Sequence, residues 1–231
     1  GVFGVTFAEM SSLTGEAGAP AMDPEQMGRY VLATPSTFAY VVPLLFGAIM
    51  ATGELRHRIL GLAFIAEPKR GIVLASKVTV LLVIGAILGL AGVAGALAAG
   101  LPFLPEGAIT TDVVLLMVRV VVALALWAVV GFGLGLLIRN QAVTIVLVLV
   151  FTQFLEPILR MVGMFWEWTA EVAKYLPGSA SDGFVGASVL SDMSALDPSM
   201  DAGNQTTFGV WPGFAVLVAY ALVSVLAGWW L

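Results

Sequence analysis

Long uninterrupted runs of apolar residues dominate the chain. Five of these runs are close to or longer than 18 residues, and they cover positions 35–52, 73–100, 113–138, 143–162 and 213–231. A helix needs about 20 apolar residues to cross the bilayer core, whereas the strands of a membrane barrel alternate polar and apolar positions. The five runs do not alternate. The pattern therefore predicts an all-α polytopic membrane protein, built as a single transmembrane domain over residues 1–231.

The polar segments between these runs differ in the sign of their charge. Segment 53–77 carries half of the chain's ten Lys and Arg residues, and the turn after the third run carries Arg139. Acidic residues instead prevail in segments 9–30, 101–112 and 163–212. Because cytoplasmic loops are enriched in Lys and Arg, we expect segment 53–77 and the Arg139 turn to face the cytoplasm and the acidic segments to face outwards. The sides alternate through all five runs and place the C-terminus in the cytoplasm.

Composition narrows the class of protein further. Hydrophobic residues make up 60% of the chain and charged residues 11%, against about 25% charged residues in an average soluble domain. Soluble enzymes are therefore excluded. A net charge of −5 lacks the basic footprint of a nucleic-acid binder. The absence of Cys excludes disulfides, thiolate metal sites and Cys nucleophiles, and a single His cannot build a multi-His metal site. We expect no metal or cofactor on this chain.

The apolar residues at both ends of the chain indicate that the protein is slightly longer than this sequence. Residues 1–8 are apolar but too few to cross a membrane, and residues 228–231 end inside an apolar run. We expect residues 1–8 to be the exit of an earlier span in a slightly longer protein. With that span entering from the cytoplasm, the protein would have six spans and both termini in the cytoplasm.

The outer segment 163–212 is too long for a simple turn and is expected to have two parts. Its first part, 165–176, carries aromatic residues typical of a membrane interface and is predicted to form a short helix at the membrane surface. Pro177 and Gly178 are expected to end this helix. The remainder, 179–205, is small, polar and acidic, which predicts an exposed loop.

The inner segment contains the pattern of a short amphipathic helix at 53–67. Its apolar face would comprise Leu55, Ile59, Leu62 and Ala66, and its first turn would be crowded by Glu54, Arg56, His57 and Arg58. Pro68 would end the helix. Two interpretations are open. The helix packs on lipid headgroups, with its basic residues obeying the positive-inside rule, or it docks a cytoplasmic partner.

Three charged side chains fall inside the predicted spans, namely Arg119, Glu156 and Arg160. Such charges are costly in a membrane and are usually paired or face a polar cavity. An ion pair, either Arg119–Glu156 or Glu156–Arg160, would lock two spans together near the outer surface. The other interpretation is contact with a substrate or a proton relay. Pro157 is expected to kink the helix after Glu156.

Glycines recur inside two of the predicted spans. The motif Gly131-Phe-Gly-Leu-Gly135 lies within an apolar run, where small residues let helices pack closely, rather than in the strand–turn–helix context of a nucleotide site. The glycines of the second run are interpreted in the same way, and they are Gly89, Gly92, Gly95 and Gly100.

Several motifs, taken in order, resemble those of type-2 ATP-binding-cassette (ABC) exporter permeases, especially the actinobacterial ones. The inner segment contributes Thr52-Gly53-Glu54, Arg56-His57, Pro68-Lys69-Arg70 and Lys77. Later matches are the glycine motif followed by Ile138-Arg139-Asn140-Gln141-Ala142, then Glu156-Pro157 and Tyr175-Leu176-Pro177. The sequence departs from that pattern at Leu55, where an aromatic residue is usual, and at Arg58-Ile59, where Gly-Thr is usual.

This resemblance implies a six-span permease of the bacterial plasma membrane, surrounded by lipid and paired with a second copy or a relative. Each copy would dock a separate ABC ATPase subunit through the 53–67 helix, and the contact residues would be Glu54, Leu55, Arg56, His57, Arg58 and Ile59. The chain has no Gly-x-x-x-x-Gly-Lys-Ser/Thr loop, so ATP and Mg²⁺ are expected on that partner and this chain is not expected to be an enzyme. The apolar interior favours a lipophilic cargo, moved outwards.

Other functions stay open at this point. The chain could be a non-transporting integral membrane subunit, with an assembly or regulatory role in a larger complex, and binding of an ATPase to the 53–67 helix would distinguish the two. An intramembrane enzyme would need Asp, Ser or His groups clustered at one depth, which the apolar runs do not contain. A secondary transporter would be expected to show internal repeats.

Overall fold

The computed structural model describes residues 24–57, 69–163, 167–187 and 208–230. Within these ranges the chain is helical and contains no strand. Five helices are long and apolar enough to cross a membrane, as predicted, so the chain has the architecture of a multi-pass α-helical membrane protein. The expected earlier span at residues 1–8 and most of the predicted 53–67 helix lie outside the described residues.

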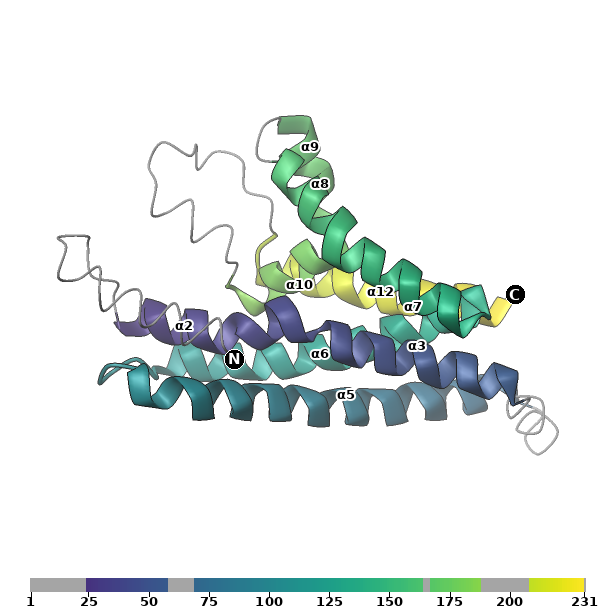
Figure 1. Cartoon of the computed structure of the whole chain (residues 1–231), viewed down its shortest axis with the longest axis horizontal. Coiled ribbons are helices and arrows are strands. Elements are labelled where there is room, and N and C mark those ends of the chain that lie inside the picture. Colours follow the sequence, from purple (N-terminus) through teal and green to yellow (C-terminus); the bar gives the residue numbers. More distant parts are fainter. Residues whose placement is uncertain (1–23, 58–68, 164–166, 188–207, 231) are drawn as a thin grey trace.

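The helices run mainly along one long axis (Figure 1). In chain order the elements are α2 (Pro24–Thr34), η1 (Pro35–Ala39), α3 (Val41–Arg56), α5 (Arg70–Gly100), η2 (Leu101–Phe103), α6 (Thr111–Ile138), α7 (Gln141–Val150), η3 (Phe151–Leu155), α8 (Glu156–Gly163), α9 (Glu167–Lys174), α10 (Pro177–Val185) and α12 (Val210–Trp230). The turns η1 and η3 are π-helical, and each lies inside a longer span. The second to fifth spans agree with the predicted runs to within three residues at each end described.

The first span starts earlier than predicted. We expected it to begin at Pro35, but the helical span is continuous over Pro24–Arg56, and Pro35 opens the π-helical turn η1 within it. A proline inside a helix removes one backbone donor, and a π-helical turn is a common way to absorb such an irregularity. The hydroxyl of Ser36 donates to the carbonyl of Ala33 at 2.7 Å and supplies a local hydrogen bond there.

The fourth span also contains an irregular turn near its proline. We expected a kink after Glu156, because Pro157 cannot donate a backbone hydrogen bond. The π-helical turn η3 (Phe151–Leu155) instead lies directly before Glu156. The irregularity is therefore on the N-terminal side of the proline, in the turn whose carbonyls the proline leaves without a donor.

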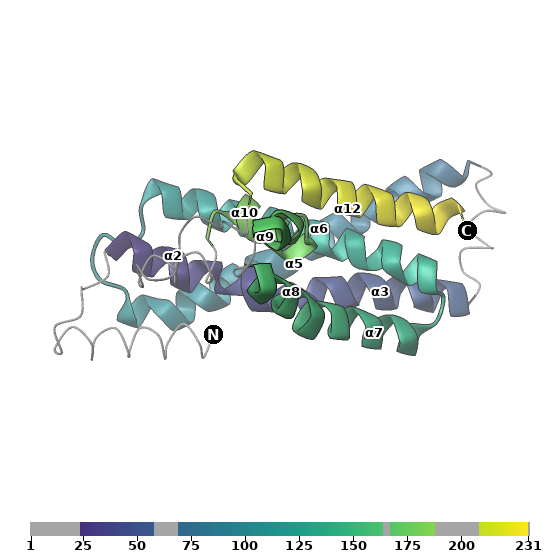
Figure 2. The same ribbon diagram turned by 90° about the horizontal axis from the view of Figure 1, so that it is seen from above.

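Helix α6 is the centre of the bundle. It packs against α3, α5 and α12, and Figure 2 shows it running between α12 on one side and α3 on the other. Its glycines allow this packing. A Cβ atom on Gly131 would overlap the backbone carbonyl of Leu44 in α3, and one on Gly133 would overlap Ser224 in α12. The packing role predicted for this motif is confirmed, whereas a Cβ atom on Gly95 of the second run would meet no atom of another described element within 4 Å.

The prediction of an exposed loop over 179–205 is wrong for its first part. Residues Pro177–Val185 form helix α10, and all nine of them are buried. Pro177 therefore begins a helix instead of only ending the previous one. Gly183 lies against the backbone of Phe208, which a larger side chain would prevent. The small side chains that resemble a loop in the sequence are the ones that let α10 fit between α6 and α12.

The bundle has two ends that differ in charge. At one end, hereafter the basic end, α3 and α6 finish and α5 and α7 begin, and the side chains there include Arg56, Lys69 and Arg139. The opposite end, where α5 finishes and α6 begins, carries the acidic residues Glu106 and Asp112. The structure therefore keeps the separation of charge that the sequence predicts.

Candidate functional site

A buried polar cluster surrounds helix α10, and its first member is Glu156. The Oε1 atom of Glu156 accepts hydrogen bonds from the backbone N–H groups of Gly178 at 2.6 Å and Ser179 at 3.2 Å. These groups are at the N-terminus of α10, where backbone donors lack partners within the helix and the helix dipole favours negative charge. Glu156, from α8, therefore caps α10 through a contact between residues 22 positions apart.

Arg160 connects α8 to the body of α10. Its Nη1 atom lies 2.8 Å from Oδ2 of Asp182, its Nε atom donates to the Ser179 hydroxyl at 2.7 Å, and Nε lies 3.7 Å from Oε1 of Glu156. Of the two predicted ion pairs, Glu156–Arg160 is therefore the one that the structure contains. The closer carboxylate is Asp182, which sequence reasoning missed because it falls in the segment predicted to be an exposed loop.

Arg119 lies at the opposite end of α10 rather than beside Glu156. A Cβ atom added to Gly186 would lie 3.3 Å from Nη1 of Arg119. Gly186 ends α10 with φ +81°, a conformation that favours glycine. Among the described residues Arg119 forms no ion pair with Glu156, so that predicted alternative is absent. A cation at the C-terminus of α10 and a carboxylate at its N-terminus both match the helix dipole.

Aromatic side chains link the cluster to the first and third spans. The Nε1–H group of Trp127 donates to the Ser181 hydroxyl at 3.1 Å, and the rings of Tyr40 and Trp127 lie 4.7 Å apart. The Tyr40 hydroxyl donates to the backbone carbonyl of Thr152 in η3 at 3.1 Å. Within the described residues, Oε2 of Glu156 and Nη2 of Arg160 are buried without a hydrogen-bond partner. The cluster fixes α10 against α8 and α6.

The basic end brings together a second set of polar residues, beginning with Glu54. We expected Glu54 in the first turn of a separate surface helix. It lies instead in the last turn of α3, where it is buried and forms an ion pair with Lys77 of α5. The difference arises because α3 continues past Gly53 to Arg56 without a break. The ion pair ties the end of one span to the beginning of the next.

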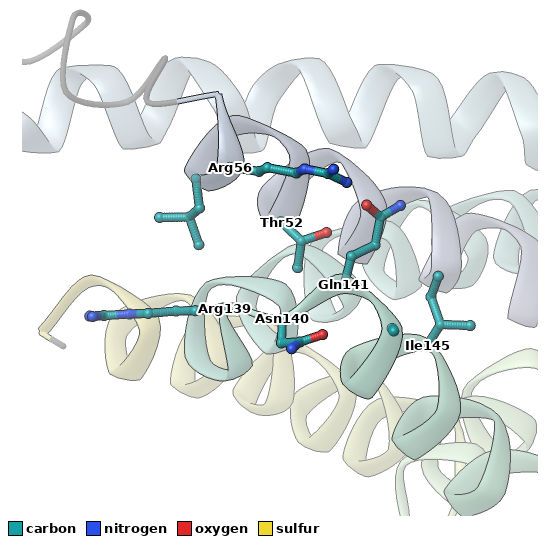
Figure 3. A pocket seen from close by; sticks show the side chains of 8 residues that line it. Thr52, Arg56, Arg139, Asn140, Gln141 and Ile145 are labelled. Atoms are coloured by element: carbon teal, nitrogen blue, oxygen red, sulfur yellow. The ribbon is translucent and has the colours of Figure 1, made fainter.

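An open pocket of about 710 Å³ lies at the basic end, between the end of α3 and the turn that joins α6 to α7. Its lining consists of Thr52, Leu55, Arg56, Arg139, Asn140, Gln141, Ala142 and Ile145. Figure 3 shows Arg56 reaching across Thr52 towards Gln141, whereas Arg139 points away from this pair. Arg139 ends α6 with φ 54°, and Oδ1 of Asn140 accepts from the Val143 N–H at 3.2 Å to cap α7.

The six predicted docking residues are distributed unevenly around this pocket. Arg56 and His57 are exposed at the end of α3, Leu55 is half-buried and Glu54 is buried. The other two, Arg58 and Ile59, lie outside the described residues together with the rest of the predicted helix. The described residues contain no group of three or more His, Asp or Glu side chains that could hold a metal ion.

Comparison of the chain with models of protein families, with curated proteins and with solved structures finds no match. The similarity of its motifs to type-2 ABC exporter permeases therefore stays a prediction from the sequence.

Proposed function

We propose that this chain is the permease subunit of an ABC exporter. In this proposal the basic end faces the cytoplasm, and segment 53–67 docks a separate ATPase subunit that holds ATP and Mg²⁺. A second copy or a relative completes the transporter in a bacterial plasma membrane. The observation that carries the proposal is the basic end itself. There, the exposed Arg56 and His57 finish a membrane-long helix, beside a turn that presents Arg139.

The contacts at this end provide a mechanical path into the membrane. Because α3 is continuous to Arg56, a displacement of the segment that follows acts directly on α3. The buried Glu54–Lys77 pair ties α3 to α5, and the close approach at Gly131 brings α6 against the backbone of α3. Closure of the ATPase subunits would move these three helices together. In this proposal Glu54 is a positioning residue that acts through Lys77.

The cargo is proposed to be lipophilic and to move outwards. Large apolar side chains are exposed along the fourth and fifth spans, and examples are Val146, Phe154, Leu222 and Val223. Such faces suit contact with lipid, with a second copy of the chain or with an apolar cargo. They offer no row of charged groups for a sugar or an ion.

The test is co-purification of the full-length protein with an ATPase, followed by vanadate-sensitive ATP hydrolysis and export in vesicles. We expect Arg56→Glu to reduce ATPase binding, because it reverses an exposed charge. Glu54→Lys should preserve binding but uncouple export, since it breaks the tie to Lys77. The control is Lys174→Glu, which reverses a half-buried charge in α9, away from the basic end. We expect that variant to leave both ATPase binding and export unchanged.

A charge exchange separates the two possible roles of Glu54. If Glu54 acts through Lys77, the double variant Glu54→Lys/Lys77→Glu restores the pair in reverse and should recover most of the export lost in Glu54→Lys. If Glu54 contacts the ATPase directly, the exchange should not recover export. Stable protein with no ATPase partner would overturn the exporter proposal and favour a non-transporting membrane subunit.

A further inference from the structure

The pocket at the basic end carries positive charge that nothing in its lining balances. Arg56 and Arg139 are both exposed, and no Asp or Glu is among the lining residues. Within the described part of the chain neither arginine forms an ion pair. The acid nearest to Arg56 in the sequence is Glu54, which is buried and already engaged by Lys77. The pocket therefore offers an anion the Arg56 guanidinium, with the charge of Arg139 at its rim, and neither has a counter-ion among the described residues.

The remaining polar groups of the pocket are suited to oxygen atoms of an anion. Gln141 and Ala142 are the first residues of α7, whose initial backbone N–H groups have no acceptor inside the helix. The Asn140 side chain caps the N–H of Val143 and leaves those of Gln141 and Ala142 available. Figure 3 shows the Gln141 amide facing Arg56 across the pocket. These donors add to the two arginines, which remain the principal charges.

The pocket continues into an apolar surface. Leu55, Ala142 and Ile145 form part of its lining. Along α7 the exposed side chains are all apolar, with Val146 60% and Val150 52% exposed. α7 belongs to a candidate membrane span that begins at Gln141. The polar part of the pocket therefore lies at the membrane surface, level with the first residue of that span. A ligand that matches both parts of the pocket has a negatively charged head and a hydrocarbon tail.

We propose that this pocket binds an anionic glycerophospholipid. The phosphate contacts Arg56 and the first N–H groups of α7, and Arg139 on the rim adds a second positive charge. The acyl chains lie along α7 beside Ile145. The apolar wall selects a membrane lipid over free phosphate. The unbalanced positive charge of the pocket selects a headgroup with a net negative charge over phosphatidylcholine, whose phosphodiester is neutralised by its own choline. The site needs no ATPase partner, but it shares Arg56 with the proposed docking surface, so lipid binding is tested in the absence of the ATPase.

The test uses the purified, delipidated full-length protein without its partners in mixed micelles. Binding of phosphatidylglycerol and of phosphatidylcholine is followed by native mass spectrometry. We expect preferential binding of phosphatidylglycerol. Arg56→Gln and Arg139→Gln should each weaken it about fivefold and the double variant about 30-fold, because a basic residue near a membrane contributes about that factor. Lys69→Gln removes a charge at the same end but outside the pocket, and should not change binding.

Two further measurements distinguish a lipid from a soluble phosphate as the ligand and check that the variants are folded. Glycerophosphoglycerol, the same headgroup without acyl chains, and inorganic phosphate should compete only weakly. Equal competition by either one, equal binding of the two lipids by the wild type, or an unchanged preference in the double variant would each overturn the proposal. The thermal midpoint of each variant is compared with that of the wild type. A loss of phosphatidylglycerol binding at an unchanged midpoint supports a direct contact.

Discussion

Replacement of Arg160 by Met tests the account of the buried cluster most directly. Arg160 lies between two carboxylates, with its side chain 11% exposed, and those of Glu156 and Asp182 are 3% and 6% exposed. Met retains most of the length and apolar volume of Arg but removes the charge. The two carboxylates then lose their shared cation in a setting where water cannot replace it.

The expected loss of unfolding free energy depends on which partners each carboxylate retains in the variant. Glu156 still accepts hydrogen bonds from two backbone N–H groups at the start of α10, so it loses less stabilisation than Asp182 does. Asp182 loses both its ion partner and its hydrogen bond at 2.8 Å. Removing one partner of a buried pair costs about 3–5 kcal/mol. We expect Arg160→Met to lower the free energy of unfolding by about 3 kcal/mol, the low end, because Asp182 can take up a proton.

The double variant Arg160→Met/Asp182→Asn makes this expectation refutable. It removes both members of the pair, so it should be more stable than Arg160→Met alone, and the two changes should be non-additive by about 2 kcal/mol. Unfolding by SDS in mixed micelles, followed by tryptophan fluorescence, measures both quantities. Lys174→Met is the control, since it breaks an exposed pair with Glu171 and should cost less than about 1 kcal/mol. Additive effects would refute the buried-pair account.

Two further predictions concern packing around α6. Gly131→Val should push α6 away from Leu44 and lower the free energy of unfolding by more than about 3 kcal/mol. Gly95→Val, at a position with no described neighbour within 4 Å, should be tolerated. The SDS unfolding midpoints of the two variants measure the difference, and equal midpoints would contradict the close approach. Trp127→Phe keeps an aromatic ring but removes the hydrogen bond to Ser181, so it should cost about 1 kcal/mol. An unchanged unfolding free energy in that variant would indicate that the bond contributes nothing to the docking of α10.

The spans could be predicted from the sequence because their signal is simple. A run of apolar residues long enough to cross a bilayer has few alternatives, and α6 and α12 start and end close to the predicted positions. The first span was less predictable. Its first turns, α2, carry Glu25 and Arg29, which form an ion pair with each other. Charged residues in a helix lower its hydropathy without breaking it, so the apolar pattern alone placed the start too late.

Helix α10 could not be recognised from local sequence. Its residues are small and polar, and the same composition favours exposed turns. What makes it a helix is tertiary: Glu156 supplies its N-terminal cap from another span, and Arg160 neutralises Asp182 within it. The one available signal was the presence of Glu156 and Arg160 inside an apolar run. Such charges require partners, and the partners had to come from elsewhere in the chain.

The buried ion pair of Glu54 could not be predicted from the sequence pattern either. The spacing that suggested a separate helix over 53–67 is equally consistent with the continuation of α3. Only the packing of α3 beside α5 brings Glu54 to Lys77. The pocket beside it depends in the same way on the turn that joins α6 to α7. Neither contact is encoded within a single stretch of residues.

The two carboxylates around Arg160 emerge from the ribosome at different times, and this imposes an order on assembly. An arginine inside a membrane span is costly unless it is paired, and Arg160 lies within the fourth span. When the fourth span enters the membrane, Glu156 is the acid one turn away from Arg160, whereas Asp182 follows 22 residues later. With nine residues, α10 is too short to cross alone, and much of its packing surface is on α12, which is synthesised after it. The local pair accompanies the arginine into the bilayer, and the long-range pair forms only after α10 and α12 have been made.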